Sequence, residues 1–366
     1  MRLALSLGEA ALGQTGTNPA VGCVVVKGGR IVGMGAHLER GKAHAEAHAL
    51  DMAGDEAEGA TVYVTLEPCA HYGRTPPCAE RLARAKVARV VIGAKDPNPL
   101  VAGRGIAFLR ERGVDVEVGV LEEEARRLHE PFFRSIETGR PFVAVKAAMS
   151  LDGRIAAPGG DSKWITNAAS RAFVQRLRHR HQAVMVGVGT VLADDPRLTV
   201  RGNGEDRAEK RQPLRIVVDS LLRTPPRAAL LAPRDDGEPA AIILTTAAAP
   251  ERARRELEAR GAEIVVAGGG PRVDLEMALR KLYERGIGSV LAEGGGTLNG
   301  ALLGRRLADR VYAFIAPKII GTGGPSGFEF PGAERLSAAI ALKNVKVTEF
   351  EGDVLVEGTP VYPADA

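Results

Sequence analysis

Runs of β-branched and aliphatic residues alternate with stretches of helical composition along almost the whole chain, which predicts an α/β fold. A first series extends from a hairpin at 21–27 and 31–35 to a helical stretch at 121–137. The tripeptide Gly139-Arg140-Pro141 then interrupts the pattern, and a second series begins with a strand at 142–148. Because 366 residues exceed the usual size of one domain, we predict two domains, 1–140 and 141–366.

The expected elements within these two series are short. The predicted helices are 43–53, 79–86 and 106–112, and the further predicted strands are 61–66, 87–94, 114–118, 184–188, 214–219, 241–246, 263–267, 289–293 and 310–316.

Composition excludes several classes of protein. Hydrophobic residues make up 45% of the chain, yet no run approaches the roughly 18 apolar residues of a membrane span. Glu9 interrupts the first apolar residues, so Leu3, Leu7 and Ala10 indicate one face of an amphipathic helix and not a signal peptide. Three cysteines are too few for a disulfide framework, which favours the cytoplasm. A net charge of +4 without a dense Lys/Arg block gives no sign of a nucleic-acid surface.

A His-x-Glu and a Pro-Cys lie on either side of a predicted strand, as in zinc-dependent deaminases. His44-Ala45-Glu46 precedes this strand, Glu67-Pro68-Cys69 follows it, and Cys78 comes after eight further residues. One imidazole and two thiolates would give zinc three ligands and leave its fourth position for water. Zinc lowers the pKa of that water to roughly 7, and the Glu46 carboxylate is placed to move protons without being a ligand.

The spacing of the two cysteines departs from the P-C-x-x-C form of this signature, because eight residues separate them instead of two. A loop can return Cys78 to the start of the next helix, where the helix N-terminus favours a thiolate. Two alternatives stay open at this point. The metal site could be a closed structural one with His48 or His71 as a fourth ligand, or the cysteines could be ordinary buried residues.

The segments around these residues resemble the deaminase domain of the bifunctional riboflavin-biosynthesis deaminase/reductase family. The likeness rests on residues 17–22 (TNPAVG), 35–37 (GAH), 44–46 (HAE), 67–78 (EPCAHYGRTPPC) and 96–105 (DPNPLVAGRG). In that family the longer loop between the cysteines is usual. The resemblance implies the three-layer α/β/α fold of cytidine deaminases, with zinc on His44, Cys69 and Cys78 and proton transfer by Glu46. It also implies substrate binding by five polar residues, each of which could otherwise serve a turn: Asn18, His37, His71, Arg74 and Asn98.

A strand that runs into three glycines and a helix marks a second candidate site. The strand is 289–293, the glycines are Gly294-Gly295-Gly296, and the helix begins at Thr297. Backbone amides at a helix N-terminus suit a pyrophosphate. The pattern is not the Rossmann fingerprint, because its third glycine would fall at Asn299, and no Gly-Lys-Ser/Thr of a Walker loop follows. On these residues alone, a purely structural turn is an equal alternative.

Together with this turn, residues 146–154, 161–166 and 187–196 resemble the reductase domain of the same family, whose fold is like that of dihydrofolate reductase. The likeness is dense from 141 to 201 and thin between about 202 and 285. The resemblance implies NADPH as the cofactor, surrounded by Ala148, Trp164, Thr190, Asp194, Ser220, Gly295, Gly296, Thr297, Leu298, Asn299, Gly300 and Ala301. It places Ser162, Arg178, Leu198, Arg201 and Glu293 at the substrate.

The two resemblances imply one bifunctional enzyme of riboflavin biosynthesis. It would deaminate 2,5-diamino-6-ribosylamino-4(3H)-pyrimidinone 5′-phosphate and then reduce the ribosyl group to ribityl with NADPH. The expected partner is this phosphorylated pyrimidine, without nucleic acid or membrane, and we expect a homo-oligomer. A nucleic-acid base deaminase would need a basic, aromatic-rich face, and an aromatic content of 4% disfavours it. A zinc-stabilised nucleotide-binding scaffold without activity is disfavoured by the open coordination and by Glu46.

Overall fold

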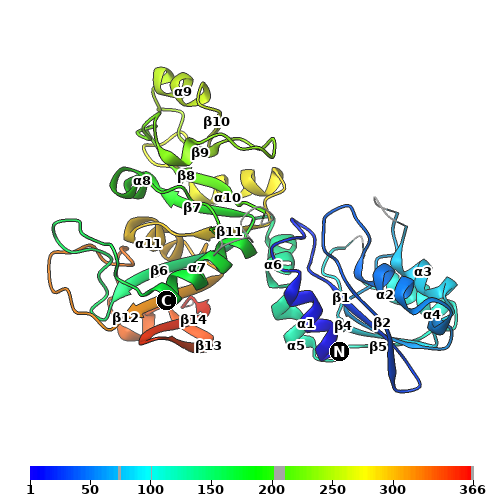
Figure 1. The fold of residues 1–366 in the computed structure, drawn as a ribbon. Helices are drawn as coiled ribbons and strands as arrows, with labels where there is room; N and C mark the ends of the chain where they lie inside the picture. Colours follow the sequence, from blue (N-terminus) through cyan, green and yellow to red (C-terminus); the bar gives the residue numbers. More distant parts are fainter. Residues whose placement is uncertain (73–75, 100, 202–210, 364–366) are drawn as a thin grey trace. The chain divides into compact units, whose positions relative to one another are not determined.

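The computed structural model describes residues 1–72, 76–99, 101–201 and 211–363. The chain divides into two compact units, Met1–Arg140 and Pro141–Ala366, each with its own sheet (Figure 1). None of the described helices is long and apolar enough to cross a membrane.

The sheet of the first unit has the strand order β2-β1-β3-β4-β5. Strand β1 (Gly22–Lys27) pairs antiparallel with β2 (Arg30–Ala36) and β3 (Thr61–Leu66), whereas β3, β4 (Arg89–Ala94) and β5 (Asp115–Val118) run parallel. The predicted hairpin and the three predicted strands are thereby confirmed. Because β3 and β4 are parallel neighbours, the loops that follow them leave the sheet at the same edge.

Helices cover both faces of this sheet (Figure 1). One apolar cluster packs side chains of α2, α3 and α4 against the sheet, and a second cluster on the other face gathers α1, α5 and α6. The first unit is therefore a three-layer α/β/α sandwich. The helix bounds are α1 Arg2–Ala10, α2 Ala45–Ala53, α3 Cys78–Arg84, α4 Arg104–Glu111, α5 Glu122–Leu128 and α6 Glu130–Thr138, with a 3-10 turn η1 at Gly54–Ala57.

Two helical details differ from the prediction. The stretch predicted as one helix over 121–137 is two helices, because α6 starts anew with Pro131 in its first turn. In α1 the buried face consists of Ala4, Leu5 and Gly8, while Leu3 is 39% exposed. A Cβ on Gly22 of β1 would lie 1.9 Å from the Ala4 carbonyl oxygen, so the backbones of α1 and β1 pack closely. This close packing requires the face with small residues, and not the face with Leu3, to be turned toward the sheet.

The sheet of the second unit has the order β10-β9-β8-β7-β11-β6-β12-β14-β13. Its first seven strands are parallel, and the last two form an antiparallel hairpin at the chain's end that the sequence pattern did not predict. The strand bounds are β6 Phe142–Ser150, β7 Ala183–Gly187, β8 Leu214–Val218, β9 Ala241–Thr245, β10 Ala262–Val266, β11 Ser289–Ala292, β12 Arg310–Ala316, β13 Ala341–Phe350 and β14 Asp353–Val361.

Alternate side chains of these parallel strands enter different apolar clusters, so both faces of the sheet are buried. Helices α10 and α11 cover one face, and α7, α8 and α9 cover the other. In such sheets ligands bind beyond the carboxyl ends of the strands. The helices and 3-10 turns are α7 Ala168–Arg180, α8 Val188–Asp194, α9 Glu251–Glu258, α10 Leu275–Glu284, α11 Gly296–Gly304, η3 Ala229–Leu231 and η4 Leu336–Ala338.

Candidate active sites

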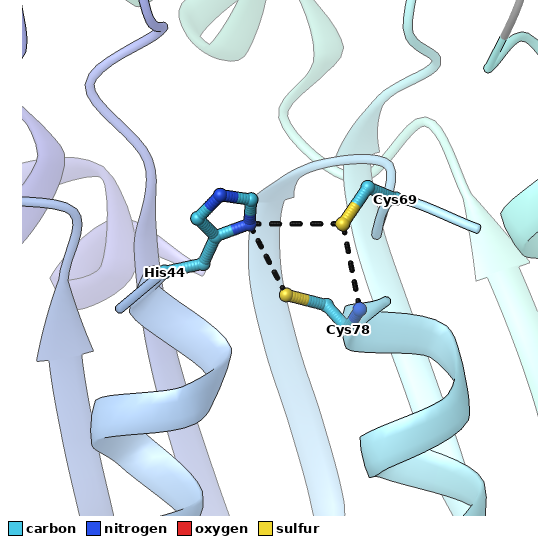
Figure 2. Close-up of side chains that lie close together, drawn as sticks. All are labelled: His44, Cys69 and Cys78. Atoms are coloured by element: carbon cyan, nitrogen blue, oxygen red, sulfur yellow. Dashed lines mark hydrogen bonds between the residues drawn. The ribbon is translucent and has the colours of Figure 1, made fainter. Parts of the chain in front are cut away.

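The three predicted zinc ligands converge in the first unit, as Figure 2 shows. His44 is the N-cap of α2, Cys69 lies in the loop after β3, and Cys78 begins α3. The Nδ1 atom of His44 is 3.7 Å from Cys69 Sγ and 3.3 Å from Cys78 Sγ. Ligand atoms on the corners of a zinc tetrahedron are about 3.6 Å apart, so the donor set and its spacing fit this metal.

The two thiols differ in their electrostatic surroundings. Hydrogen bonding to the Cys78 thiol lowers the pKa of Cys69 against the effect of burial, and His44 and the Cys78 backbone N–H, 3.4 Å from Cys69 Sγ, lower it further. Hydrogen bonding to Cys69 and burial raise the pKa of Cys78. The pocket therefore already favours one thiolate, which is the form that binds a metal.

Glu46 lies in the first turn of α2, two residues after His44, and is buried. Burial, reinforced by the charge of Cys69, raises the pKa of its carboxyl to about 7. A group with such a pKa can both accept and donate a proton at neutral pH. The metal-binding group contains neither Glu46 nor the two alternative ligands His48 and His71 among the described residues, so the geometry favours three protein ligands.

Buried His37 forms a pair with half-buried Asn18 beside the predicted metal ligands. The Nδ1 atom of His37 is 3.1 Å from the Ala43 carbonyl oxygen, and its Nε2 atom is 3.1 Å from Asn18 Nδ2. Because a carbonyl only accepts, Nδ1 carries the proton and Nε2 accepts from the Asn18 amide. His37 is 2% exposed, with its ring edge-on to that of His44 at 5.2 Å between centroids. Both nitrogens of His37 are therefore engaged within the protein.

The other predicted substrate residues of the first unit lie in loops. His71 is exposed, two residues after Cys69, and Asn98 is half-buried in the loop after β4. The backbone N–H of Asn98 donates to Asp96 Oδ1 at 2.8 Å. Because β3 and β4 are parallel, these two loops leave the sheet at the same edge. Arg74 lies outside the described residues.

In the second unit, two predicted substrate residues pair with each other. Arg178 of α7 donates two hydrogen bonds to Glu293, the residue directly after β11: Nε to Oε1 at 2.6 Å and Nη2 to Oε2 at 3.0 Å. Lys146 Nζ of β6 is 3.9 Å from Glu293 Oε2. Although burial opposes ionisation, the charges of Arg178 and Lys146 keep the pKa of Glu293 below its ordinary value. The cluster is thus a buried carboxylate between two cations.

The glycines of the predicted phosphate turn differ in what surrounds them. A Cβ on Gly296 would lie 2.2 Å from the Ser326 carbonyl oxygen, and one on Gly300 would lie 2.1 Å from that of Glu329. Packing of α11 against the protein's own chain therefore requires these two glycines. A Cβ on Gly295 would meet nothing nearer than 3.8 Å, and Thr190 Oγ1 is 3.9 Å from it. Gly295 is the position that leaves room for a ligand.

Other residues predicted around the cofactor differ in their surroundings. Thr297 Oγ1 donates to Glu329 Oε2 at 3.0 Å, and buried Asn299 donates through Nδ2 to the Gly327 carbonyl oxygen at 3.2 Å. Ser220, just beyond β8, accepts from the Val273 N–H through Oγ at 3.1 Å. Trp164 is exposed, with the Arg171 guanidinium 4.6 Å from its ring centroid. The remaining ones are Ala148 at the end of β6, exposed Asp194 at the end of α8, and Leu298 and Ala301 within α11.

The other three predicted substrate residues of the second unit have contacts different from those of the ion-paired cluster. The Leu198 side chain is buried in an apolar cluster, so its backbone is the part that could meet a ligand. Arg201 is exposed, and its N–H donates to Gln175 Oε1 at 2.9 Å. Ser162 is half-buried in the loop before Trp164.

Comparison with known proteins identifies the family. Residues 1–94 match the model of the cytidine and deoxycytidylate deaminase zinc-binding region, and residues 141–356 match that of the RibD C-terminal domain. The riboflavin biosynthesis protein RibD of Bacillus amyloliquefaciens is 42% identical over 361 residues, covering 98% of this chain and 95% of that protein. The RibD of Escherichia coli is 41% identical and covers 97% and 96%. The chain belongs to the RibD family.

Solved RibD structures match the chain over both units. One form of Acinetobacter baumannii RibD is 38% identical and superposes with a TM-score of 0.89, covering 98% of this chain and 97% of that one. A Thermotoga maritima protein described as a diaminohydroxyphosphoribosylaminopyrimidine deaminase/5-amino-6-(5-phosphoribosylamino)uracil reductase is 36% identical, with a TM-score of 0.83 and coverage of 99% and 97%. The chain is therefore a bifunctional enzyme of riboflavin biosynthesis, a zinc-dependent deaminase joined to an NADPH-dependent reductase. The predicted family, fold class, activities and cofactors are confirmed.

Lys146 is a candidate site residue of the reductase unit that sequence reasoning missed. Its signal was available, because it is the one charged residue in the otherwise uncharged strand β6, FVAVKAAMS. A lysine is retained inside a buried strand when it has a partner, and that partner, Glu293, lies 147 residues further along the chain (293 − 146).

Proposed function

We propose that the first unit deaminates 2,5-diamino-6-ribosylamino-4(3H)-pyrimidinone 5′-phosphate and that the second unit then reduces the ribosyl group of the product to ribityl. The observation that carries this proposal is the convergence of His44, Cys69 and Cys78 beside the buried carboxyl of Glu46. The description of the Thermotoga relative supports the same pair of reactions.

In the deaminase, His44 Nδ1 and the sulfur atoms of Cys69 and Cys78 would hold the zinc. Bound zinc supplies a polarised water as the nucleophile. Glu46, with a pKa near neutrality, would take one proton from the water and pass it to a ring nitrogen of the pyrimidine, and would then pass the second proton of that water to the leaving amino group. Its burial beside the ligands lets one carboxyl serve both proton transfers.

Asn18 is the residue proposed to read the pyrimidine in that site. Because its amide donates to His37 Nε2, the orientation of the side chain is determined, and its oxygen can accept from an amino group of the substrate. His37 then contributes by orienting Asn18 and packing against His44. Of the other three proposed contacts, His71 and Asn98 come from the loops after β3 and β4, and Arg74 offers a charge for the phosphate.

In the reductase, NADPH supplies the hydride, and the protein binds and orients the two reactants. Gly295 offers the uncrowded approach for the pyrophosphate at the start of α11. The ion-paired cluster of Glu293, Arg178 and Lys146 would contact the substrate. The remaining contacts proposed for NADPH are Ala148, Trp164, Thr190, Asp194, Ser220 and the helix residues 296–301, and those for the substrate are Ser162, the Leu198 backbone and Arg201.

The finer statements on partners belong to the same proposal. We propose a homo-oligomer in the cytoplasm, the compartment that the small number of cysteines favours. We propose no nucleic-acid partner, which the small net charge and the low aromatic content support. Light scattering during size-exclusion chromatography measures the oligomeric state.

One experiment tests the two activities together. Purified protein is incubated with the diaminopyrimidine phosphate, with and without NADPH, and the products are identified by mass. Without NADPH we expect exchange of one amino group for oxygen, and with NADPH the further gain of two hydrogens. Removal of zinc by a chelator should stop deamination and leave reduction of the deaminated substrate intact. Reduction of the undeaminated compound at a comparable rate would contradict the proposed order.

A further inference from the structure

The buried carboxylate of Glu67 has a set of partners that metal binding does not explain. Glu67 follows β3 directly and is 4% exposed. Its Oε2 atom accepts from the backbone N–H groups of Gly103 at 3.0 Å and Asp96 at 3.3 Å. Its Oε1 atom accepts from those of Gly105 at 3.1 Å and Ile106 at 3.4 Å. One side chain thus receives four backbone hydrogen bonds from a segment that begins 29 residues later.

These bonds join the loop that carries a zinc ligand to the loop that carries Asn98. Cys69 lies two residues after Glu67, and Asn98 lies two residues after Asp96. The loops also meet through the backbone, since a Cβ on Gly105 would lie 2.0 Å from the Pro68 carbonyl oxygen. The carboxylate therefore clamps the loop after β4 against the loop after β3.

The clamp needs a carboxylate specifically. Gly103 is the N-cap of α4, and Gly105 and Ile106 lie in its first turn, where backbone N–H groups have no partner within the helix. An ionised carboxylate only accepts, and the positive end of the helix dipole favours its charge. A glutamine in its place would direct an NH₂ group at two of these N–H donors and leave them unpaired.

We propose that Glu67 is a positioning residue of the deaminase, which sets the place of Asn98 relative to the zinc ligands and thereby the affinity for the pyrimidine. This inference rests on the proposed contact between Asn98 and the substrate. Zinc binding does not depend on the clamp, because the Ala79 N–H donates to the Cys69 carbonyl oxygen at 3.1 Å and holds that residue independently.

The test is Glu67→Gln in the full-length protein, with KM and kcat of deamination, zinc content and reductase activity all measured on one preparation. We expect KM for the pyrimidine to rise about tenfold or more, with kcat changed by less than about threefold. Zinc should stay at one equivalent per chain, and reductase activity should not change. Glu56→Gln is the matched control, because this exposed carboxylate of η1 binds the exposed side chain of Arg30 at 3.0 Å and should leave KM unchanged.

Two further variants keep the inference falsifiable. Gly105→Ala places a Cβ against the Pro68 carbonyl oxygen, which forces the same two loops apart, and it should also raise KM for the pyrimidine. This variant tests the positioning role if Glu67→Gln does not fold. A fall in kcat in proportion to lost zinc, with KM unchanged, would show that Glu67 only stabilises the unit and would overturn the inference. If Asn98→Ala raises KM but Glu67→Gln and Gly105→Ala do not, the positioning role is refuted while the substrate contact stands. If Asn98→Ala leaves KM unchanged, the proposed contact itself fails.

Discussion

The cluster of Glu293, Arg178 and Lys146 allows a quantitative test of the second site. Glu293→Gln keeps the size of the side chain but removes the negative charge between two cations. The side chains of Arg178 and Lys146 are 13% and 16% exposed, so water cannot replace the lost charge effectively. Breaking a buried pair costs about 3–5 kcal/mol. Because Arg178 keeps its bond to the Thr199 carbonyl oxygen at 3.0 Å, we expect the lower limit, about 3 kcal/mol of unfolding free energy.

The assay uses Trp164, the one tryptophan of the chain, which lies in the second unit. Urea unfolding followed by its fluorescence reports on this unit. Glu263→Gln is the matched control, because Glu263 also binds an arginine, Arg285, at 2.6 Å, but with side chains 39% and 35% exposed. The control should lose less than about 1 kcal/mol. In Glu293→Gln, reduction of the pyrimidine should fall while deamination survives. Equal losses of stability in the two variants would refute a buried, ionised cluster.

Four further predictions extend to the rest of the molecule. Glu46→Gln should retain zinc and lower kcat of deamination by about 10²–10⁴, and loss of zinc from the variant would make Glu46 a ligand. Gly295→Val should raise KM for NADPH far more than KM for the pyrimidine, and unchanged NADPH kinetics would reduce the segment to a structural turn. Residues 141–366 alone should fold and reduce the deaminated substrate, and an insoluble or inert fragment would contradict their independence. Burial lowers the pKa of His181 to about 4 from 6.5, so the unfolded chain binds the proton more readily between these values and stability falls with decreasing pH. We expect the free energy of unfolding to fall by about 2 kcal/mol between pH 7 and pH 5, and His181→Phe should remove this loss. Equal pH dependence of urea unfolding in the unsubstituted protein and in the variant would contradict the prediction.

The sequence by itself determined most of the local structure and the set of candidate zinc ligands. Strand β3 has the bounds 61–66 that its β-branched run predicted, and β12 has the predicted bounds 310–316. The candidate zinc ligands His44 and Cys69 were recognisable because one helix, one 3-10 turn and one strand separate them, so a short stretch of chain brings them together. Both kinds of signal depend on near neighbours, which is why they can be identified before any tertiary contact is known.

Tertiary structure decided what several recognisable residues do. The glycine turn was identified, but contact with the backbone at Ser326 is by itself enough to require glycine at position 296. His37 was predicted at the substrate, yet both of its ring nitrogens bind protein atoms. In each example the deciding partner belongs to a different element from the residue itself, and the sequence pattern around the residue carries no record of it.

The order of strands in the second sheet explains how the ion-paired cluster comes together from distant parts of the chain. Strand β11 inserts between β7 and β6, which places Glu293 near Lys146 of β6 and within reach of Arg178 of α7, although 115 residues separate Glu293 from Arg178. Glu67 presents the same case in the first unit, where parallel pairing of β3 with β4 brings its carboxylate to the start of α4. Strand runs and motif spacings are local and can be recognised in the sequence. The pairing of distant strands depends on the free energy of burying both faces of a sheet, which only the complete fold determines.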